Sequence, residues 1–114
     1  MARHWFGHGT VKEWGTKQTN AADVTVHAQA IAPDNGTYEV LLVIGGSVAI
    51  VWNVQHRDAP NTATLATQAL QSVAGQHGEY RLWVELSKNE RIRILNDGVI
   101  AGTSSAGVML MKMK

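Results

Sequence analysis

Apolar and polar residues alternate along several short stretches of this chain, with the period of a β-strand that has one covered face. The clearest stretch is residues 79–86, where one face would carry Tyr80, Leu82, Val84 and Leu86 and the other Glu79, Arg81, Trp83 and Glu85. Similar patterns predict strands over residues 24–31, 37–44, 47–56, 91–95, 99–101 and 106–114. Residues 47–56 are nearly apolar on both faces, which predicts a central strand.

The last predicted strand carries a methionine at every second position. Met109, Met111 and Met113 would share one face, opposite Val108 and Leu110. Methionine fills gaps in a core and also adapts to the surface of a partner. These three residues are therefore either ordinary packing or a candidate oligomer interface.

Short polar segments separate the predicted strands. Pro33-Asp34-Asn35-Gly36 combines a fixed φ, two side chains that bond their own backbone and a glycine that accepts a positive φ. We expect a hairpin to follow it, with a break at Gly45-Gly46 between the next two strands. Ser87-Lys88-Asn89-Glu90 and Asn96-Asp97-Gly98 predict two further turns.

Residues 62–74 fit two kinds of element. Their apolar residues recur at near-helical spacing, namely Leu65, Ala66, Ala69, Leu70 and Val73. The threonines among them are poor helix formers, namely Thr62, Thr64 and Thr67. We favour a bent edge strand and leave a helix as the alternative.

Seven or eight short strands separated by turn signals predict an all-β fold. The architecture we expect is an antiparallel two-sheet sandwich of the jelly-roll type, spanning residues 21–114. An immunoglobulin-type sandwich is the rival, but the chain lacks its Cys and Trp signature. Residues 1–20 differ in composition and predict an extended N-terminal arm.

Composition excludes several classes of function. The 114 residues include no Cys, so disulfides, thiolate zinc sites and cysteine nucleophiles are excluded. Ten Lys and Arg against nine Asp and Glu give a net charge of +1, without the basic excess expected of a nucleic-acid-binding protein. The apolar runs within residues 40–54 are too short and interrupted to span a bilayer, and residues 1–7 lack the apolar stretch of a signal peptide.

The predicted arm holds the richest cluster of functional side chains: His4, Trp5, Phe6, His8 and Trp14. Two histidines four residues apart would share a helix face, but glycines interleave with them and zinc takes three or four ligands. We therefore expect no metal here. Aromatic residues dominate interface energetics, so His4, Trp5, Phe6 and Trp14 are the candidate residues for binding a partner.

Candidates for catalysis are weak elsewhere in the chain. His27, His56 and His77 are isolated in sequence and are expected to be polar surface or strand-edge residues rather than bases. Glu79 and Glu85 lie about 20 Å apart at the strand rise, too far for glycosidase chemistry. We therefore expect no enzyme and no cofactor.

One predicted face combines an aromatic residue with positive charge. Arg81, Arg91 and Arg93 beside Trp83 would resemble a stacking groove for single-stranded nucleic acid. Three glutamates offset that charge, namely Glu79, Glu85 and Glu90. We therefore expect cross-strand ion pairs on a solvated or intersubunit face, with Trp83, Arg81 and Arg93 as a possible interface or sugar-stacking face.

The last third of the chain resembles the closing strands of tumour-necrosis-factor-like jelly rolls. The resemblance rests on residues 80–86 (YRLWVEL), 88–94 (KNERIRI) and 102–110 (GTSSAGVML), in which a strand, a turn and an alternating strand precede a Ser-rich segment. The pattern departs at Asn89-Glu90, where that family commonly has Gly-Asp, and at Ala106, where it has an aromatic residue.

Within this architecture the chain resembles the small capsid decoration, or cement, proteins of tailed bacteriophages. The resemblance is one of size, aromatic arm and lack of a catalytic set. It implies a homo-oligomer, a trimer before a dimer, that binds major capsid protein on the exterior of a virion. From the charge balance and the short apolar runs, we expect no nucleic acid and no membrane as partners; outside a virion, we expect the chain in the cytoplasm. The alternative is a carbohydrate- or receptor-binding head of a tail or adhesion protein.

Overall fold

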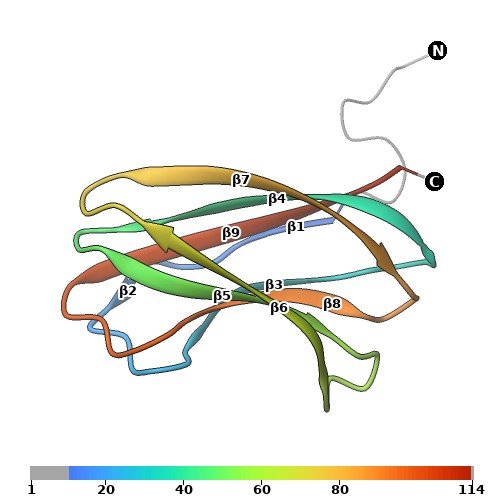
Figure 1. Ribbon diagram of the computed structural model, residues 1–114, viewed down its shortest axis with the longest axis horizontal. Helices are drawn as coiled ribbons and strands as arrows, with labels where there is room; N and C mark the ends of the chain where they lie inside the picture. The colour runs from blue at the N-terminus through green and yellow to red at the C-terminus, as the bar shows by residue number, and fades with distance from the viewer. Residues whose placement is uncertain (1–10, 114) are drawn as a thin grey trace.

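Two antiparallel β-sheets lie face to face in the computed structural model, which describes residues 11–113 (Figure 1). The strands are β1 (Val11–Trp14), β2 (Gln18–Thr19), β3 (Val26–Ile31), β4 (Gly36–Gly46), β5 (Ile50–Arg57), β6 (Thr64–Ser72), β7 (His77–Leu86), β8 (Arg91–Asn96) and β9 (Thr103–Lys112). Sheet A has the order β1-β9-β4-β7, with β2 also paired to β9, and sheet B has the order β3-β8-β5-β6. The all-β, jelly-roll-like sandwich expected from the sequence is confirmed.

The core lies between the sheets and is built from the alternation visible in the sequence. The fully buried apolar side chains come from both sheets: Tyr38, Val40, Leu42, Ile44, Trp52, Ile94, Val108 and Leu110. Polar side chains in the core have partners: Trp52 Nε1 donates to Ser72 Oγ at 2.9 Å, and the Asn96 amide donates to the Ala22 carbonyl at 2.9 Å. Each such bond avoids the cost of burying an unsatisfied donor.

Consecutive strands mostly cross from one sheet to the other. β3 and β4, β4 and β5, and β7 and β8 lie in opposite sheets, whereas β5 and β6 form a hairpin. The hairpin predicted after Pro33-Asp34-Asn35-Gly36 is therefore wrong. The turn residues mark where the chain reverses, but they do not determine which sheet receives the next strand.

One uncertain element is settled by the structure, and two predicted boundaries differ from it. Residues 62–74 do contain a strand, β6. Gly45 and Gly46 lie inside β4 rather than breaking it: a Cβ at Gly45 would lie 2.6 Å from the Gln76 carbonyl oxygen, so close packing requires the glycine. Residues 99–101 are not a strand, and Ile100 instead lies in a loop with its side chain in the core.

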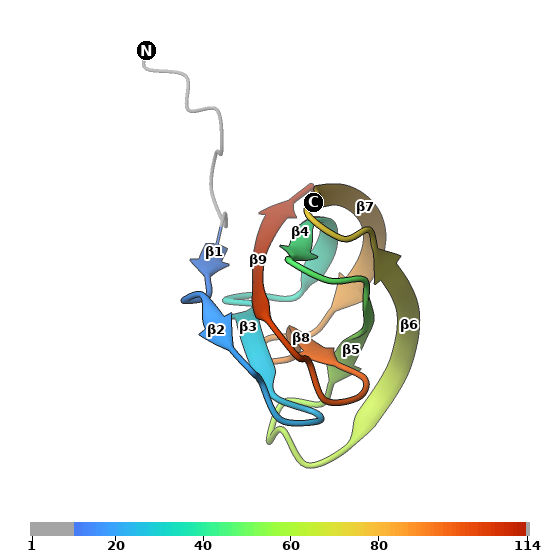
Figure 2. The ribbon, with the colours of Figure 1, turned by 90° about the vertical axis from the view of Figure 1, so that its left-hand side faces the viewer.

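The predicted arm is partly incorporated into the sandwich. β1 pairs with β9 from Val11↔Leu110 to Trp14↔Gly107, and β2 pairs with the start of β9. The boundary expected at residue 20 therefore does not separate an arm from the sheets. Figure 2 shows β1 and β2 at one edge of the sandwich and β6 and β7 at the other.

Candidate interaction surfaces

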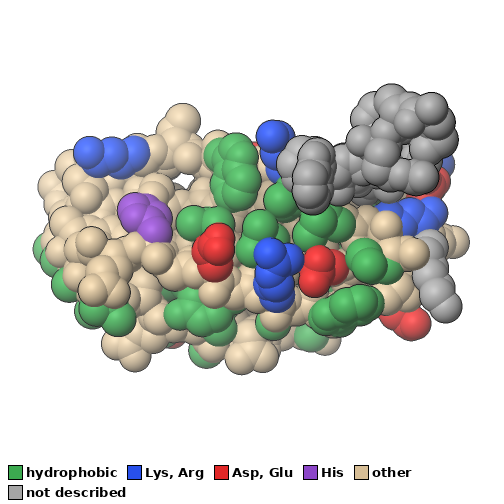
Figure 3. Space-filling view, turned by 90° about the horizontal axis from the view of Figure 1, so that it is seen from above, with side chains coloured by type: hydrophobic (Ala, Val, Ile, Leu, Met, Phe, Trp, Pro, Cys, Tyr) green, Lys and Arg blue, Asp and Glu red, His purple; other side chains and the backbone are tan. Residues whose placement is uncertain are grey.

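The outer face of sheet A carries an apolar centre between two exposed tryptophans. Leu41 and Val43 from β4 lie beside Met109 and Met111 from β9, in the register Leu41↔Met109. Trp14 on β1 and Trp83 on β7 flank this centre, with 51% and 65% of their surface exposed. Figure 3 views this face and shows hydrophobic side chains lying among acidic and basic ones. We call these six residues the sheet A face.

The position of Trp14 depends on a glycine in the neighbouring strand. Its indole lies over Gly107, where a Cβ would overlap the ring. Since Gly107 pairs with Trp14 in the β1–β9 ladder, the missing side chain makes room for the indole to lie flat on the sheet. The sequence singled out Trp14 as a partner-binding residue but did not indicate that this glycine positions it.

Trp83 lies on the same face as Trp14, but on β7 at the opposite edge of sheet A. It pairs with Glu39 across the β4–β7 ladder. Glu39 Oε1 forms an ion pair with Arg81 Nη1 at 3.4 Å. Arg81 is largely exposed, so this pair is screened by solvent and contributes little to stability. An exposed indole beside a carboxylate and a guanidinium offers both a stacking surface and hydrogen-bonding groups.

Arg93 does not join this face. It lies on β8 in sheet B, where its Nε donates to Gln55 Oε1 at 2.8 Å. The predicted grouping of Arg81, Trp83 and Arg93 on one face is therefore wrong, and Arg91, also on β8, is likewise separated from Trp83. The alternation placed each side chain on one side of its strand, but only the topology decides which strands share a sheet.

The methionines differ from one another. Met109 is buried on the sheet A face, Met111 is half-buried beside it, and Met113 follows β9 with half of its surface exposed. Val108 and Leu110 are buried in the core on the opposite side, as the alternation predicts. Met109 and Met111 thus belong to a possible interface with the other residues of the sheet A face.

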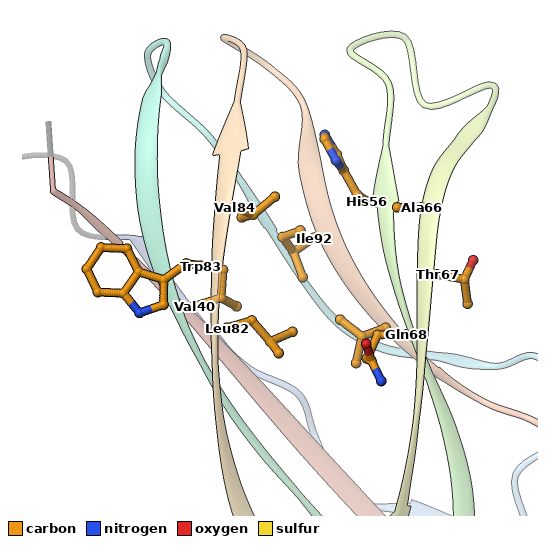
Figure 4. A pocket seen from close by; sticks show the side chains of 10 residues that line it. Val40, His56, Ala66, Thr67, Gln68, Leu82, Trp83, Val84 and Ile92 are labelled. Atoms are coloured by element: carbon orange, nitrogen blue, oxygen red, sulfur yellow. The ribbon is translucent and has the colours of Figure 1, made fainter.

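An apolar cleft opens at the edge where β6 and β7 part. It has a volume of about 220 Å³, and its lining includes Leu82, Val84, Ile92, Ala66 and Gln68. Figure 4 shows Leu82 and Val84 pointing into it, while Trp83 lies on the other side of β7. The strands are joined nearer their turn by Tyr80, whose hydroxyl donates to the Gln71 carbonyl at 3.0 Å. We call this space the β6–β7 cleft; sequence reasoning missed it, because the cleft depends on how the strands diverge.

The described histidines each have a structural partner. His27 is buried, against expectation, with its Nε2 2.9 Å from Ser104 Oγ and its ring edge-on to Trp52 at 4.8 Å. Desolvation by burial lowers the pKa of His27. His56 Nε2 lies 2.9 Å from Glu90 Oε1, and His77 Nε2 lies 2.8 Å from Ser105 Oγ. Among residues 11–113 no three His, Asp or Glu side chains are grouped as metal ligands.

Three of the predicted partner-binding residues, His4, Trp5 and Phe6, lie outside the described residues. Of that set only Trp14 has a described position, in β1. The described part of the chain contains no helix long and apolar enough to cross a membrane.

Comparison with known proteins gives the fold. No family model matches the sequence, and no curated protein matches it at the sequence level. Among solved structures, the chain is similar to a carbohydrate-binding module of Cellvibrio mixtus lichenase 5A in complex with cellotriose, at 17% identity and a TM-score of 0.55 over 94% of this chain and 89% of that one. It is similar to the Eiger TNF of S. frugiperda, at 15% identity and a TM-score of 0.56 over 92% of each chain.

A third similar structure is a viral shell protein, VP2 of the infectious bursal disease virus subviral particle. The identity is 11% and the TM-score 0.50, over 90% of this chain and 32% of that one. All three neighbours are jelly-roll folds, so these likenesses establish the fold and are compatible with structural or binding roles.

Proposed function

We propose that this protein is a structural virion component that decorates a capsid as a closed homo-oligomer and bridges major capsid subunits. The observation that carries the proposal is the sheet A face, an apolar sheet surface flanked by Trp14 and Trp83. The two tryptophans are exposed and the four central residues are buried or half-buried. A contiguous apolar patch with exposed aromatic side chains marks a site of protein association. The VP2 likeness supports the proposal only in that a viral shell protein uses the same fold.

The chain presents two different apolar surfaces at different places, the sheet A face and the β6–β7 cleft. A contact that joins unlike surfaces is head-to-tail, and it forms a ring when the rotation closes. We propose that the sheet A face of one copy packs on the β6–β7 edge of the next. A trimer is the ring that the resemblance to tumour-necrosis-factor-like proteins implies.

Residues 1–10 precede β1 and supply Trp5 and Phe6 as anchors for the capsid. Large aromatic side chains contribute much of the binding energy of interfaces. A short segment with two of them can therefore bind a capsid subunit. In this proposal the sandwich provides self-association and the N-terminal residues provide attachment.

The test compares the full chain with a variant that lacks residues 1–10 and keeps β1. Light scattering gives the mass of each in solution, and sedimentation with empty capsid shells of the virus that encodes the chain gives binding. We expect both proteins to have the mass of one closed oligomer and only the full chain to sediment with shells. A monomeric full chain, or a truncated chain that fills the shells equally well, contradicts the proposal.

Binding of a neutral sugar is the second candidate function, favoured by the exposure of Trp83 beside Glu39 and Arg81. A flat indole stacks on a sugar ring, and the charged neighbours hydrogen-bond its hydroxyls. A glycan array and titration of tryptophan fluorescence with cello-oligosaccharides test it. Loss of binding in Trp83→Ala supports this function, and an array without hits counts against it.

A further inference from the structure

Three arginines gather on the outer face of sheet B. Arg57 on β5 and Arg91 on β8 are direct cross-strand partners, and Arg93 lies two residues further along β8. The inward positions between them belong to Ile92 and Ile94, so the arginines occupy the outward positions. Like charges placed directly opposite on a sheet are destabilising. The cluster therefore lowers the stability of the fold, and its presence is not explained by a stabilising role.

Neutral groups hold these side chains in place. Arg57 donates from Nε to Asn61 Oδ1 at 2.9 Å and from Nη1 to Thr64 Oγ1 at 2.7 Å. Arg93 donates from Nε to Gln55 Oε1 at 2.8 Å, and Arg91 donates from Nη1 to Gln29 Oε1 at 3.4 Å. No described carboxylate forms an ion pair with any of the three. The guanidinium groups are thus oriented but not neutralised.

The carboxylates next to the cluster in sequence bind elsewhere. Asp58 Oδ1 accepts from the backbone N–H groups of Thr62 and Ala63, at 2.7 and 3.0 Å. These bonds, that to Ala63 above all, lower the pKa of Asp58, and the charge of Arg57 is the smallest contribution. Glu90 Oε1 accepts from the Ser87 N–H and lies against His56. Neither acid is available to compensate the arginines fully.

Donors in the cluster remain unused within the described part of the chain. Arg91 Nε is buried and has no hydrogen-bond partner. The two terminal nitrogens of Arg93 donate no bond to residues 11–113. Burial, and after it the charges of Arg57 and Arg91, lower the pKa of Arg93, as expected for cations crowded together. An incoming anion would satisfy these donors and relieve the repulsion.

We propose that Arg57, Arg91 and Arg93 form a binding site for an acidic polysaccharide, whose carboxylate or sulfate groups pair with the guanidinium groups. Amide side chains surround the arginines, namely Gln29, Asn53 and Gln55, and these both donate to and accept from sugar hydroxyls. None of the described aromatic side chains lies on this face, so it lacks the stacking platform used for single-stranded nucleic acid. The site is on the sheet opposite the sheet A face and stays accessible when that face is covered.

The test measures binding of the full chain to a sulfated heparin oligosaccharide and to an oligogalacturonide, with cellohexaose and oligo-dT as comparison ligands. We expect the acidic sugars to bind, the neutral sugar not to bind here, and the affinity to fall as salt rises. Arg91→Gln and Arg93→Gln should each weaken acidic-sugar binding about tenfold or more, because each removes a charge-assisted hydrogen bond. The control is Lys17→Gln, an exposed lysine between β1 and β2 of the other sheet, which should bind as the wild type does.

The two binding variants should fold at least as stably as the wild type, since each removes one of three crowded charges. Their mass and their sedimentation with capsid shells should be unchanged, so failure here is distinct from failure of the decoration proposal. The site is overturned if neither acidic sugar binds, if Lys17→Gln weakens binding as much as Arg91→Gln, or if oligo-dT binds more tightly than both sugars. The last result would assign the face to nucleic acid instead.

Discussion

The indole of Trp14 lies over Gly107, so that an aromatic ring in β1 occupies the space where its partner residue in β9 has no side chain. This contact attaches the first described strand to sheet A and holds a half-exposed aromatic ring on the sheet A face. One glycine thus contributes both to the fold and to the proposed interface.

Replacing Gly107 by Val should displace Trp14 and destabilise the domain. A side chain at residue 107 would overlap the indole, so either the ring or β1 must move. We expect the free energy of unfolding to fall by about 1–3 kcal/mol, the usual cost of overpacking. Urea unfolding followed by tryptophan fluorescence measures it. The control is Thr103→Ala at the start of the same strand, which should change stability by less than about 0.5 kcal/mol.

Stability should fall as the pH drops below about 6.5, because of His27. Burial lowers the pKa of this imidazole below its ordinary value of 6.5 in the folded protein. Below pH 6.5 the unfolded chain therefore binds a proton that the native chain does not, and this favours unfolding. The neutral His27 is therefore fully compatible with the fold above the unfolded pKa of 6.5. Stability is lost as the pH falls from 6.5 towards the lowered pKa of His27 in the folded protein. Urea unfolding at pH 7.5 and pH 5.5 tests it.

The comparison for that experiment is His27→Gln, which keeps a hydrogen-bonding side chain but does not titrate in this range. Its stability should vary less between the two pH values than that of the wild type. Asp58 and Glu90 also have lowered pKa values, but their ordinary values of 3.8 and 4.5 place their contribution at lower pH. A wild-type protein equally stable at both pH values would contradict the role of His27.

Ser72→Ala should weaken the core by leaving Trp52 without its acceptor. The indole Nε1 donates to Ser72 Oγ at 2.9 Å, and both side chains are buried. An unsatisfied buried donor costs about 1–3 kcal/mol, and thermal unfolding measures the loss. Ser87→Ala in an exposed turn is the matched change, and it should be close to neutral. Equal effects of the two substitutions would show that the Trp52 bond contributes nothing.

The strands and the orientation of their side chains were predictable, because they depend on residues close together in the sequence. The alternation of Tyr80, Leu82, Val84 and Leu86 with three charged residues and Trp83 gives the inner and outer sides of β7 as the structure has them. The threonines in residues 62–74 correctly favoured a strand over a helix. These features follow from side-chain period and local propensity, which a sequence displays directly.

The interaction surfaces were predicted only in pieces, because they depend on strand order. Arg81 and Arg93 look equivalent in sequence, since each occupies an outward position, yet β7 and β8 lie in opposite sheets. Arg57 was not associated with Arg91 because they lie 34 positions apart in sequence, and only the β5–β8 register brings them together. Trp14 was identified by its type, but Gly107 as the residue beneath it could not be inferred without the β1–β9 pairing.

Self-association through the sheet A face should be abolished by charge. Leu41→Glu together with Met111→Glu places two carboxylates in the apolar centre of the proposed contact. Burying unpaired charges in an interface is costly, so the mass in solution should fall to the 12.4 kDa of one chain. Ile31→Glu, at an exposed position on sheet B, is the control and should keep the wild-type mass. Light scattering measures all three proteins.

A mixing experiment then distinguishes a head-to-tail contact from a symmetric one. Ala66→Arg alters the β6–β7 cleft and leaves the sheet A face intact, whereas the double glutamate variant does the reverse. In a head-to-tail ring, each variant alone should be monomeric. The mixture should form a one-to-one dimer through its single functional pair of surfaces, because neither chain can extend it. If two identical sheet A faces pack on each other instead, Ala66→Arg should associate by itself and gain nothing from its partner.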